Sequence, residues 1–266
     1  MGRLTPKTPT ELAEIVRDSQ RLPIPLLSPG EGLSFAELRG DIRHDVADGV
    51  VSCLAGTTLR GLNDALAKDD RCIPHASVWP DDAKDLSLAV LILLGLPHAA
   101  EAARGSWRDW ILGATMVTAE GTIVKSGSRV VKSVAGYDAH KLLVGSRGSL
   151  ILPAEITLRT FHISAASFPH PVQRLGDKVR SILRVRPTDM RIALDELQED
   201  VLWSDSETGT VWSSRSVQDL PVIPFSWSMD PFSPAIEAKT LALQRKAKAV
   251  LDPTGKLAPG AFVNLP

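Results

Sequence analysis

Short turns rich in glycine and serine are the residues of this chain whose types and spacing could do chemistry. The first such turn is Ser28-Pro29-Gly30-Glu31-Gly32. Because glycine has no Cβ, the backbone N–H groups of a turn like this can come close to a phosphate. Pro29 lacks an N–H, however, and Glu31 adds a negative charge. The turn therefore indicates either a weakened phosphate site at Ser28, Gly30 and Gly32 or an ordinary surface turn.

A longer set of glycine, serine and charged residues follows in residues 104–155. It contains Gly105-Ser106-Trp107-Arg108-Asp109, Leu112-Gly113, Val131-Lys132-Ser133-Val134-Ala135-Gly136-Tyr137-Asp138 and Gly145-Ser146-Arg147-Gly148-Ser149-Leu150. This order resembles the signature of the FAD-binding subunit of bacterial glycolate oxidase, a flavoprotein of the vanillyl-alcohol oxidase or PCMH type. Residues 251–260, Leu-Asp-Pro-Thr-Gly-Lys-Leu-Ala-Pro-Gly, are similar to the closing motif of the same family. The resemblance thus reaches both ends of the family's fold.

The resemblance implies an FAD site with altered phosphate turns. The family's second phosphate turn would fall at residues 85–88, where both of its glycines are missing and Ser87 remains. Each lost neutral donor costs about 0.5–1.5 kcal/mol, so we expect FAD to be bound weakly or not at all. The cofactor-binding residues that the resemblance implies are Ser28, Gly30, Gly32, Ser87, Gly105, Ser106, Asp109, Leu112, Gly113, Leu150 and Ile151.

Other chemistry is not indicated. No His or Cys lies in the first phosphate turn, so we expect the flavin to be noncovalent. The histidines are scattered and form no metal motif, and no catalytic residue can be assigned from spacing. Gly105 to Asp109 could instead be a plain turn with a surface ion pair. Tyr137, the only tyrosine, is better explained as a structural anchor than as a catalytic acid.

The amino-acid composition limits the kinds of partner and cellular compartment that we expect for this protein. Thirty Lys and Arg against thirty-one Asp and Glu give a net charge of −1, which argues against nucleic acid or an anionic membrane as partner. Cys53 and Cys72 have no metal or redox spacing, so we expect a cytoplasmic protein. The longest apolar run, Leu86–Leu96, is too short to cross a bilayer, which takes about 20 residues. It predicts a buried helix or a strand pair.

Local patterns predict most of the elements. Thr8-Pro9-Thr10-Glu11 is a capping box and starts a helix that runs to about residue 19. Leucines at helical spacing predict a second helix over residues 59–66, and Asp138 could cap a short helix that carries Leu142 and Leu143. A last helix is expected over residues 236–251. Its residues available for burial are Leu241, Leu243, Ala247 and Val250.

Strands are expected at residues 25–27, 50–54 and 150–161, with a hairpin over residues 111–125. This mixture predicts the α+β class. The family resemblance makes the expectation more specific: it implies a PCMH-type FAD-binding fold of two α/β subdomains with a shortened cap region. The predicted boundaries are 1–162 for the FAD-binding domain, 163–230 for the cap and 231–266 for a C-terminal helix and return segment.

The resemblance implies an FAD-binding-type subunit of a glycolate-oxidase-like complex. Its partners would be a companion flavoprotein subunit that oxidises a small 2-hydroxy acid and an iron–sulfur subunit that takes the electrons onward. The complex could bring the chain to the inner face of the membrane. The alternative is a flavin-free structural or regulatory subunit that keeps the flavoprotein fold. An independent oxidase is a distant third possibility. Trp203, Trp212, Phe225 and Trp227 could be interface anchors or part of the chain's own core.

Overall fold

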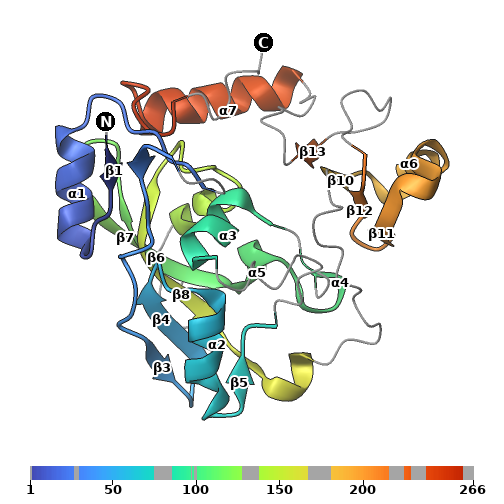
Figure 1. Cartoon of the computed structure of the whole chain (residues 1–266), viewed down its shortest axis with the longest axis horizontal. Coiled ribbons are helices and arrows are strands. Elements are labelled where there is room, and N and C mark those ends of the chain that lie inside the picture. The colour runs from blue at the N-terminus through green and yellow to red at the C-terminus, as the bar shows by residue number, and fades with distance from the viewer. Residues whose placement is uncertain are drawn as a thin grey trace.

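The computed structural model describes residues 2–26, 30–74, 86–96, 98, 101–127, 138–166, 181–215, 225–228 and 238–259. Helices and strands are mixed along the chain, and two antiparallel sheets carry most of the strands (Figure 1). This arrangement confirms the predicted α+β class. No helix among the described residues is long and apolar enough to cross a membrane.

The larger sheet has five antiparallel strands in the order β3-β4-β8-β6-β7. They are β3 (Arg43–Asp45), β4 (Val50–Leu54), β8 (Leu152–Arg159), β6 (Ile111–Val117) and β7 (Ile123–Gly127). This result confirms the predicted strand at residues 50–54 and the hairpin over residues 111–125. Side chains on β8 alternate between the two faces, because successive residues of a strand point to opposite sides. Leu152, Ala154, Ile156 and Leu158 belong to the core, whereas Glu155 and Thr157 line the opposite, polar face.

Three described helices have a Thr or Ser N-cap whose side chain accepts a backbone N–H, and two of them begin where the sequence patterns place a helix. Helix α1 (Pro9–Asp18) has Thr8 as its N-cap, with the Glu11 N–H donating to Thr8 Oγ1 at 3.1 Å. In α2 (Leu59–Ala67), Thr58 Oγ1 accepts from the Gly61 N–H at 3.1 Å. Ser87 caps α3 (Leu88–Leu94), so the apolar run is a helix and not a strand pair. The last predicted helix is α7 (Ala238–Leu251).

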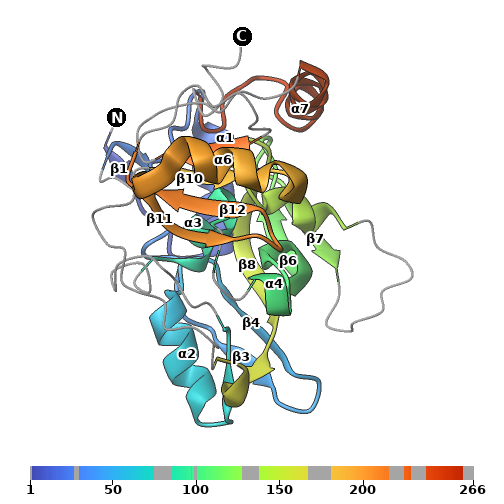
Figure 2. The same ribbon diagram turned by 90° about the vertical axis from the view of Figure 1, so that its right-hand side faces the viewer.

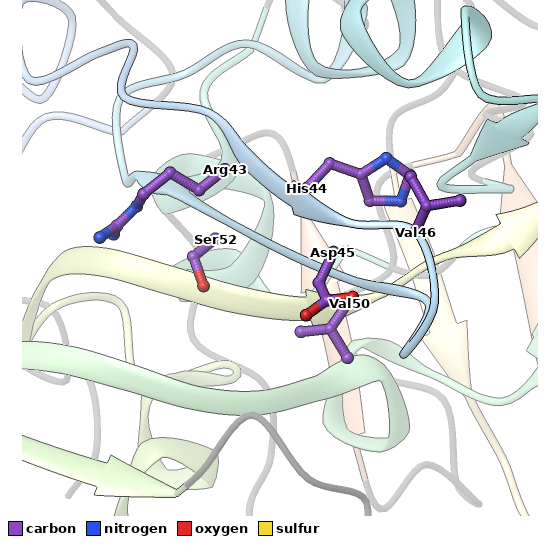
Figure 3. Close-up of a pocket in the computed structure, with 6 residues that line it drawn as sticks. All are labelled: Arg43, His44, Asp45, Val46, Val50 and Ser52. Carbon is purple, nitrogen blue, oxygen red and sulfur yellow. The ribbon is translucent and has the colours of Figure 1, made fainter.

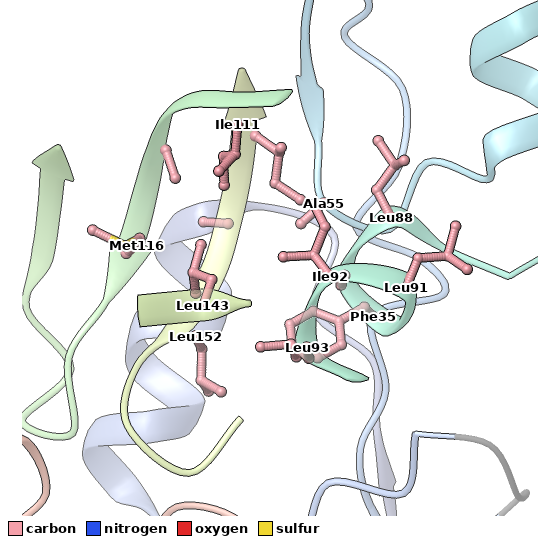
Figure 4. Close-up of a cluster of buried hydrophobic side chains, with 14 of the residues drawn as sticks. Phe35, Ala55, Leu88, Leu91, Ile92, Leu93, Ile111, Met116, Leu143 and Leu152 are labelled. Atoms are coloured by element: carbon pink, nitrogen blue, oxygen red, sulfur yellow. The ribbon is translucent and has the colours of Figure 1, made fainter. Parts of the chain in front are cut away.

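Helix α3 lies in the centre of the main core (Figure 4). Its apolar side chains share this core with residues of β6 and β8 and with Phe35 and Ala55. A helix that is apolar all round is stable only when it is buried on all sides. Leu88, Leu91, Ile92 and Leu93 are indeed fully buried.

The remaining described elements of the first 166 residues are short. Strand β1 (Arg3–Leu4) pairs in parallel with β2 (Gly32–Leu33), and β5 (Arg71–Cys72) pairs with β9 (Phe161–His162). Two one-turn helices, α4 (Glu101–Arg104) and α5 (Trp107–Trp110), precede β6. Asp138 precedes a 3-10 helix, Ala139–Leu143, without a side-chain cap bond; its carboxylate instead pairs with Lys141.

A second sheet is formed inside residues 163–230, where the sequence analysis identified no elements. Its order is β11-β12-β10-β13, with β11 (Val201–Asp205), β12 (Thr210–Ser213), β10 (Ser181–Arg184) and β13 (Phe225–Ser228). Helix α6 (Met190–Leu197) packs on this sheet (Figure 2). Ile182 and Trp212 belong to the main core, and Arg184 pairs with Glu101, so the sheet is packed against the larger unit. The predicted boundaries at residues 162 and 230 stay predictions.

Two local predictions were wrong. Pro25 and Leu26 are not in a strand, which agrees with the missing N–H groups of Pro23 and Pro25. Leu243 and Val250 on α7 are 69% and 78% exposed instead of buried. Helix α7 lies at the periphery (Figure 1), and Lys248 on this helix makes three hydrogen bonds to the rest of the chain.

Trp212 is a core residue of this chain, because its side chain is fully buried in the main cluster and packs edge to face on Trp203. We expect Trp212→Ala to lower the free energy of unfolding by about 3–5 kcal/mol, the cost of a large cavity. Urea denaturation of the isolated chain measures this loss. A loss below about 1 kcal/mol would contradict the assignment to the core.

Candidate functional site

The loop over residues 144–151, which is part of the family-like motif, lies against two other segments of the chain. The N–H groups of Gly145 and Arg147 donate to the carbonyls of Ile92 and Leu93, at 3.0 and 2.8 Å. The loop therefore rests on the C-terminal end of α3. A Cβ on Gly148 would lie 2.8 Å from Cδ1 of Ile24, in the segment that leads to the first glycine turn. The predicted residues Leu150 and Ile151 follow directly, half-buried and buried.

Serine hydroxyl groups hold the loop from within. Ser146 Oγ donates to the Leu143 carbonyl at 2.9 Å, and Ser149 Oγ donates to the Ser146 carbonyl at 2.6 Å. Ser149 is fully buried. These bonds satisfy polar groups that would otherwise be costly inside the protein, and they fix the path of the chain just before Leu150.

Lys248 and Asp252 connect the C-terminal motif to this loop by hydrogen bonds. Lys248 Nζ donates to the Ser149 carbonyl at 2.7 Å, to the Leu257 carbonyl at 2.8 Å and to Asp252 Oδ2 at 2.5 Å. Asp252 also accepts from the N–H groups of Lys256 and Leu257. Burial by itself would raise the pKa of Asp252, but the Lys248 bond and these N–H groups hold it below its ordinary value. The carboxylate is therefore ionised at neutral pH.

Only Gly30, Glu31 and Gly32 of the first glycine turn are among the described residues. Ser28 lies outside the described residues, and Gly30 is exposed. Gly32 is buried with φ of +121°, and a Cβ at this position would run into the Pro23 backbone. Its N–H makes a long bond of 3.4 Å to the Gly2 carbonyl. Packing within the chain thus accounts for the glycine at position 32.

The second turn is likewise closed by internal hydrogen bonds. Ser87 Oγ accepts from the Val90 N–H at 3.3 Å. The Leu88 N–H donates to the Thr57 carbonyl at 2.9 Å, and the Ala89 N–H donates to the Ala55 carbonyl at 2.7 Å. The first three N–H groups of α3 therefore already have partners in the protein. The described part of this turn does not fit a pyrophosphate, which would have to replace these bonds.

Gly105, Ser106 and Asp109 form a compact capping unit at the start of α5. Both the N–H and the hydroxyl of Ser106 donate to Asp109 Oδ2, at 2.8 Å each. The backbone N–H of Ser106 is the main cause that lowers the pKa of Asp109, against a smaller effect of burial. Gly105 has φ of +82°, and a Cβ there would lie 2.9 Å from Asp109. The local geometry is that of a helix capping box, and the role of these residues at a flavin edge stays a prediction.

Leu112 and Gly113 lie on β6, beside the polar face of the larger sheet. A Cβ on Gly127 of β7 would run into the Leu112 carbonyl, so the two strands approach closely here. Gly113 lines a pocket of about 210 Å³ together with the ion pair of Arg43 and Glu155. A neighbouring pocket of about 280 Å³ lies on the β3–β4 hairpin (Figure 3). The sequence analysis did not identify these two pockets.

Sequence reasoning also missed Lys248 and Asp252 as contacts of the loop. The Asp252-Pro253 motif indicated family likeness but no function, and Lys248 lies one helical turn before it. The bond from Lys248 Nζ to the Ser149 carbonyl joins positions 99 residues apart in the chain, which no local pattern reveals. The stretch from Val131 to Tyr137, with Gly136, lies outside the described residues.

Comparison with known proteins agrees with the sequence motifs. No family model matches the chain. Glycolate oxidase subunit GlcE of Escherichia coli is 30% identical over 138 residues, which are 52% of this chain and 39% of that protein. D-lactate dehydrogenase of Archaeoglobus fulgidus is 23% identical over 230 residues, covering 79% of this chain and 50% of that protein. The chain thus spans about half the length, or less, of these relatives.

Among solved structures, 6-hydroxy-D-nicotine oxidase from Arthrobacter nicotinovorans is similar over 75% of this chain and 44% of its own, with 15% identity and a TM-score of 0.48. The homologues of this chain therefore include a glycolate oxidase subunit and a D-lactate dehydrogenase. These homologues confirm the resemblance to glycolate oxidase subunits that the motifs indicated.

Gly105 offers a test of the capping unit. We expect Gly105→Ala to lower the free energy of unfolding by about 2–3 kcal/mol, because Ala would need a positive φ and would press on Asp109. Gly255→Ala is the matched control, since Gly255 has φ of +66° but open space around its Cα. It should cost only about 1 kcal/mol. Equal losses in urea denaturation would show that the contact with Asp109 has no effect.

Proposed function

We propose that the chain is an FAD-binding-type subunit of a glycolate-oxidase-like 2-hydroxy-acid dehydrogenase complex. The observation that carries the proposal is the path of the loop over residues 144–151, which leads directly into the predicted flavin-contacting residues Leu150 and Ile151. This loop, which matches the family motif, contacts α3 and Ile24 through specific close approaches. The similarity to glycolate oxidase subunit GlcE supports the same assignment.

The flavin would lie along the segments that the family resemblance implies. Leu150 and Ile151 would contact it from the loop, and Gly105, Ser106, Asp109, Leu112 and Gly113 from α5 and β6. When bound, the flavin ring supplies the redox chemistry, and the protein binds and orients it. The phosphate end has few donors among the described residues, because the first N–H groups of α3 are engaged inside the protein. This supports weak binding.

A noncovalent flavin agrees with the state of the two cysteines. Both thiols are buried. Burial raises the pKa of Cys53 to about 12 and also raises the pKa of Cys72. A thiol with a raised pKa stays protonated at neutral pH and is a poor nucleophile.

The partners we propose are a companion flavoprotein subunit and an iron–sulfur subunit. The companion would oxidise a small 2-hydroxy acid, and the iron–sulfur subunit would carry the electrons onward. This chain has only two cysteines, too few to hold a cluster with four thiolates. The proposed location is the cytoplasm, with contact to the inner face of the membrane only through these partners.

A second candidate function is a flavin-free structural or regulatory subunit. It is favoured by the closed state of the α3 N-terminus, where Leu88, Ala89 and Val90 donate to acceptors in the protein. A helix whose first N–H groups already have acceptors in the protein does not need a phosphate to satisfy them. The amount of flavin bound by the purified protein separates the two functions.

FAD titration tests the leading proposal. We expect the protein to quench FAD fluorescence with a dissociation constant in the micromolar range or weaker, and to release unmodified FAD on heating. Pro29→Gly with Glu31→Gly should tighten binding by about tenfold, since it restores a donor and removes a negative charge. Glu37→Gln, at another exposed carboxylate, is the control. No quenching by either form would favour the flavin-free subunit.

Co-purification tests membership in a complex. We expect co-expression with a companion flavoprotein subunit and an iron–sulfur subunit of the glycolate oxidase type to give an assembly that survives gel filtration. If this chain elutes from gel filtration without the other subunits, the proposed complex is contradicted. The FAD titration then still tests whether the chain binds flavin.

A further inference from the structure

The loop over residues 144–151 has a backbone path that needs support from outside. Arg147 and Gly148 are consecutive residues with φ of +53° and +73°. Glycine adopts such angles freely, but for arginine the left-handed region is unfavourable. A residue in this region persists only where the surrounding structure holds it.

The support comes from two sides. On one side, the Gly145 and Arg147 N–H groups donate to the carbonyls at the end of α3. On the other side, Lys248 Nζ donates to the Ser149 carbonyl at 2.7 Å. Ser149 immediately precedes Leu150, so this bond fixes the chain at the point where it enters the proposed flavin-contacting segment.

Lys248 is itself held in place. An ammonium group has three N–H donors, and those of Lys248 have three oxygen acceptors, on Ser149, Asp252 and Leu257. Asp252 is 1% exposed and is further fixed by the N–H groups of Lys256 and Leu257. Lys248 therefore makes a directed contact with the loop, unlike a solvated surface lysine.

We propose that Lys248 is a positioning residue for the flavin. It holds the Ser149 carbonyl, and so keeps Leu150 and Ile151 where they can line the cofactor. This inference rests on the function proposed above. Loss of the Lys248 ammonium leaves the Ser149 carbonyl without this donor and the buried Asp252 without its cation, so the loop is free to relax away from the bound geometry.

The test compares Lys248→Met with Lys256→Met in the full chain. Lys256 is a matched control in the same motif, because its Nζ also donates to a backbone carbonyl, that of Val16 in α1, at 2.6 Å. FAD titration is carried out well below the melting temperature of each variant, where all are folded. We expect Lys248→Met to weaken FAD binding at least tenfold and Lys256→Met to change it less than twofold.

A second readout needs no flavin. Hydrogen exchange of residues 144–151 in the apo protein should be faster in Lys248→Met than in the parent and in Lys256→Met. If Lys248→Met does not fold, Asp252→Asn is used instead. It removes the charge that fixes Lys248 and should change FAD affinity and exchange in the same direction.

Unchanged FAD affinity in Lys248→Met, or an equal loss in Lys256→Met, overturns the positioning role while the proposed function stands. A parent protein that binds no FAD overturns the proposed function, and the positioning role with it. The two failures are therefore distinguishable.

Discussion

The ammonium of Lys248 donates to the carbonyls of Ser149 and Leu257 and to the carboxylate of Asp252, and these bonds join the C-terminal segment to a loop 99 residues earlier. The same segment pairs with Leu22, whose N–H donates to the Lys256 carbonyl at 2.8 Å. A buried carboxylate is tolerated only when it is paired and hydrogen-bonded. The charge of Asp252 thus requires Lys248 close by, and the pair brings the two ends of the family resemblance together.

Helix α3 explains how the fold can be stable without a phosphate at the predicted second turn. The first N–H groups of a helix have no partner inside the helix and must find one elsewhere. In many nucleotide-binding proteins an anion supplies it. Here the carbonyls of Thr57 and Ala55 and the hydroxyl of Ser87 accept these bonds. Burial of the apolar helix then stabilises the core with or without a ligand.

The two sheets are joined by both apolar and charged contacts. Ile182 and Trp212 extend the main core into the second sheet. Arg184 on β10 pairs with the largely buried Glu101 on α4. Dispersion and hydrophobic contacts are not directional, whereas an ion pair with one buried partner strongly penalises any shift that separates the charges. The pair therefore helps to set how the second sheet sits on the larger unit.

Local sequence patterns were sufficient to predict the helices and strands that depend only on neighbouring residues. The Thr8 cap, the leucine spacing of α2 and the hairpin over residues 111–125 depend on neighbouring residues, and the structure confirms them. The α+β class follows from the same patterns. The family likeness came from short motifs whose order in the chain is specific, and the relatives confirm it.

Only the tertiary structure decided the rest. The strands of the second sheet are short, and their partners lie up to tens of residues away, so no periodicity marks them. Helix α7 turns Lys248 toward the Ser149 carbonyl and leaves Leu243 and Val250 exposed, which the apolar pattern of the helix does not predict. The hydrogen bonds at the predicted second turn depend on which carbonyls of residues 55–57 face α3. Such contacts arise from the packing of distant segments, and an isolated stretch of sequence does not contain them.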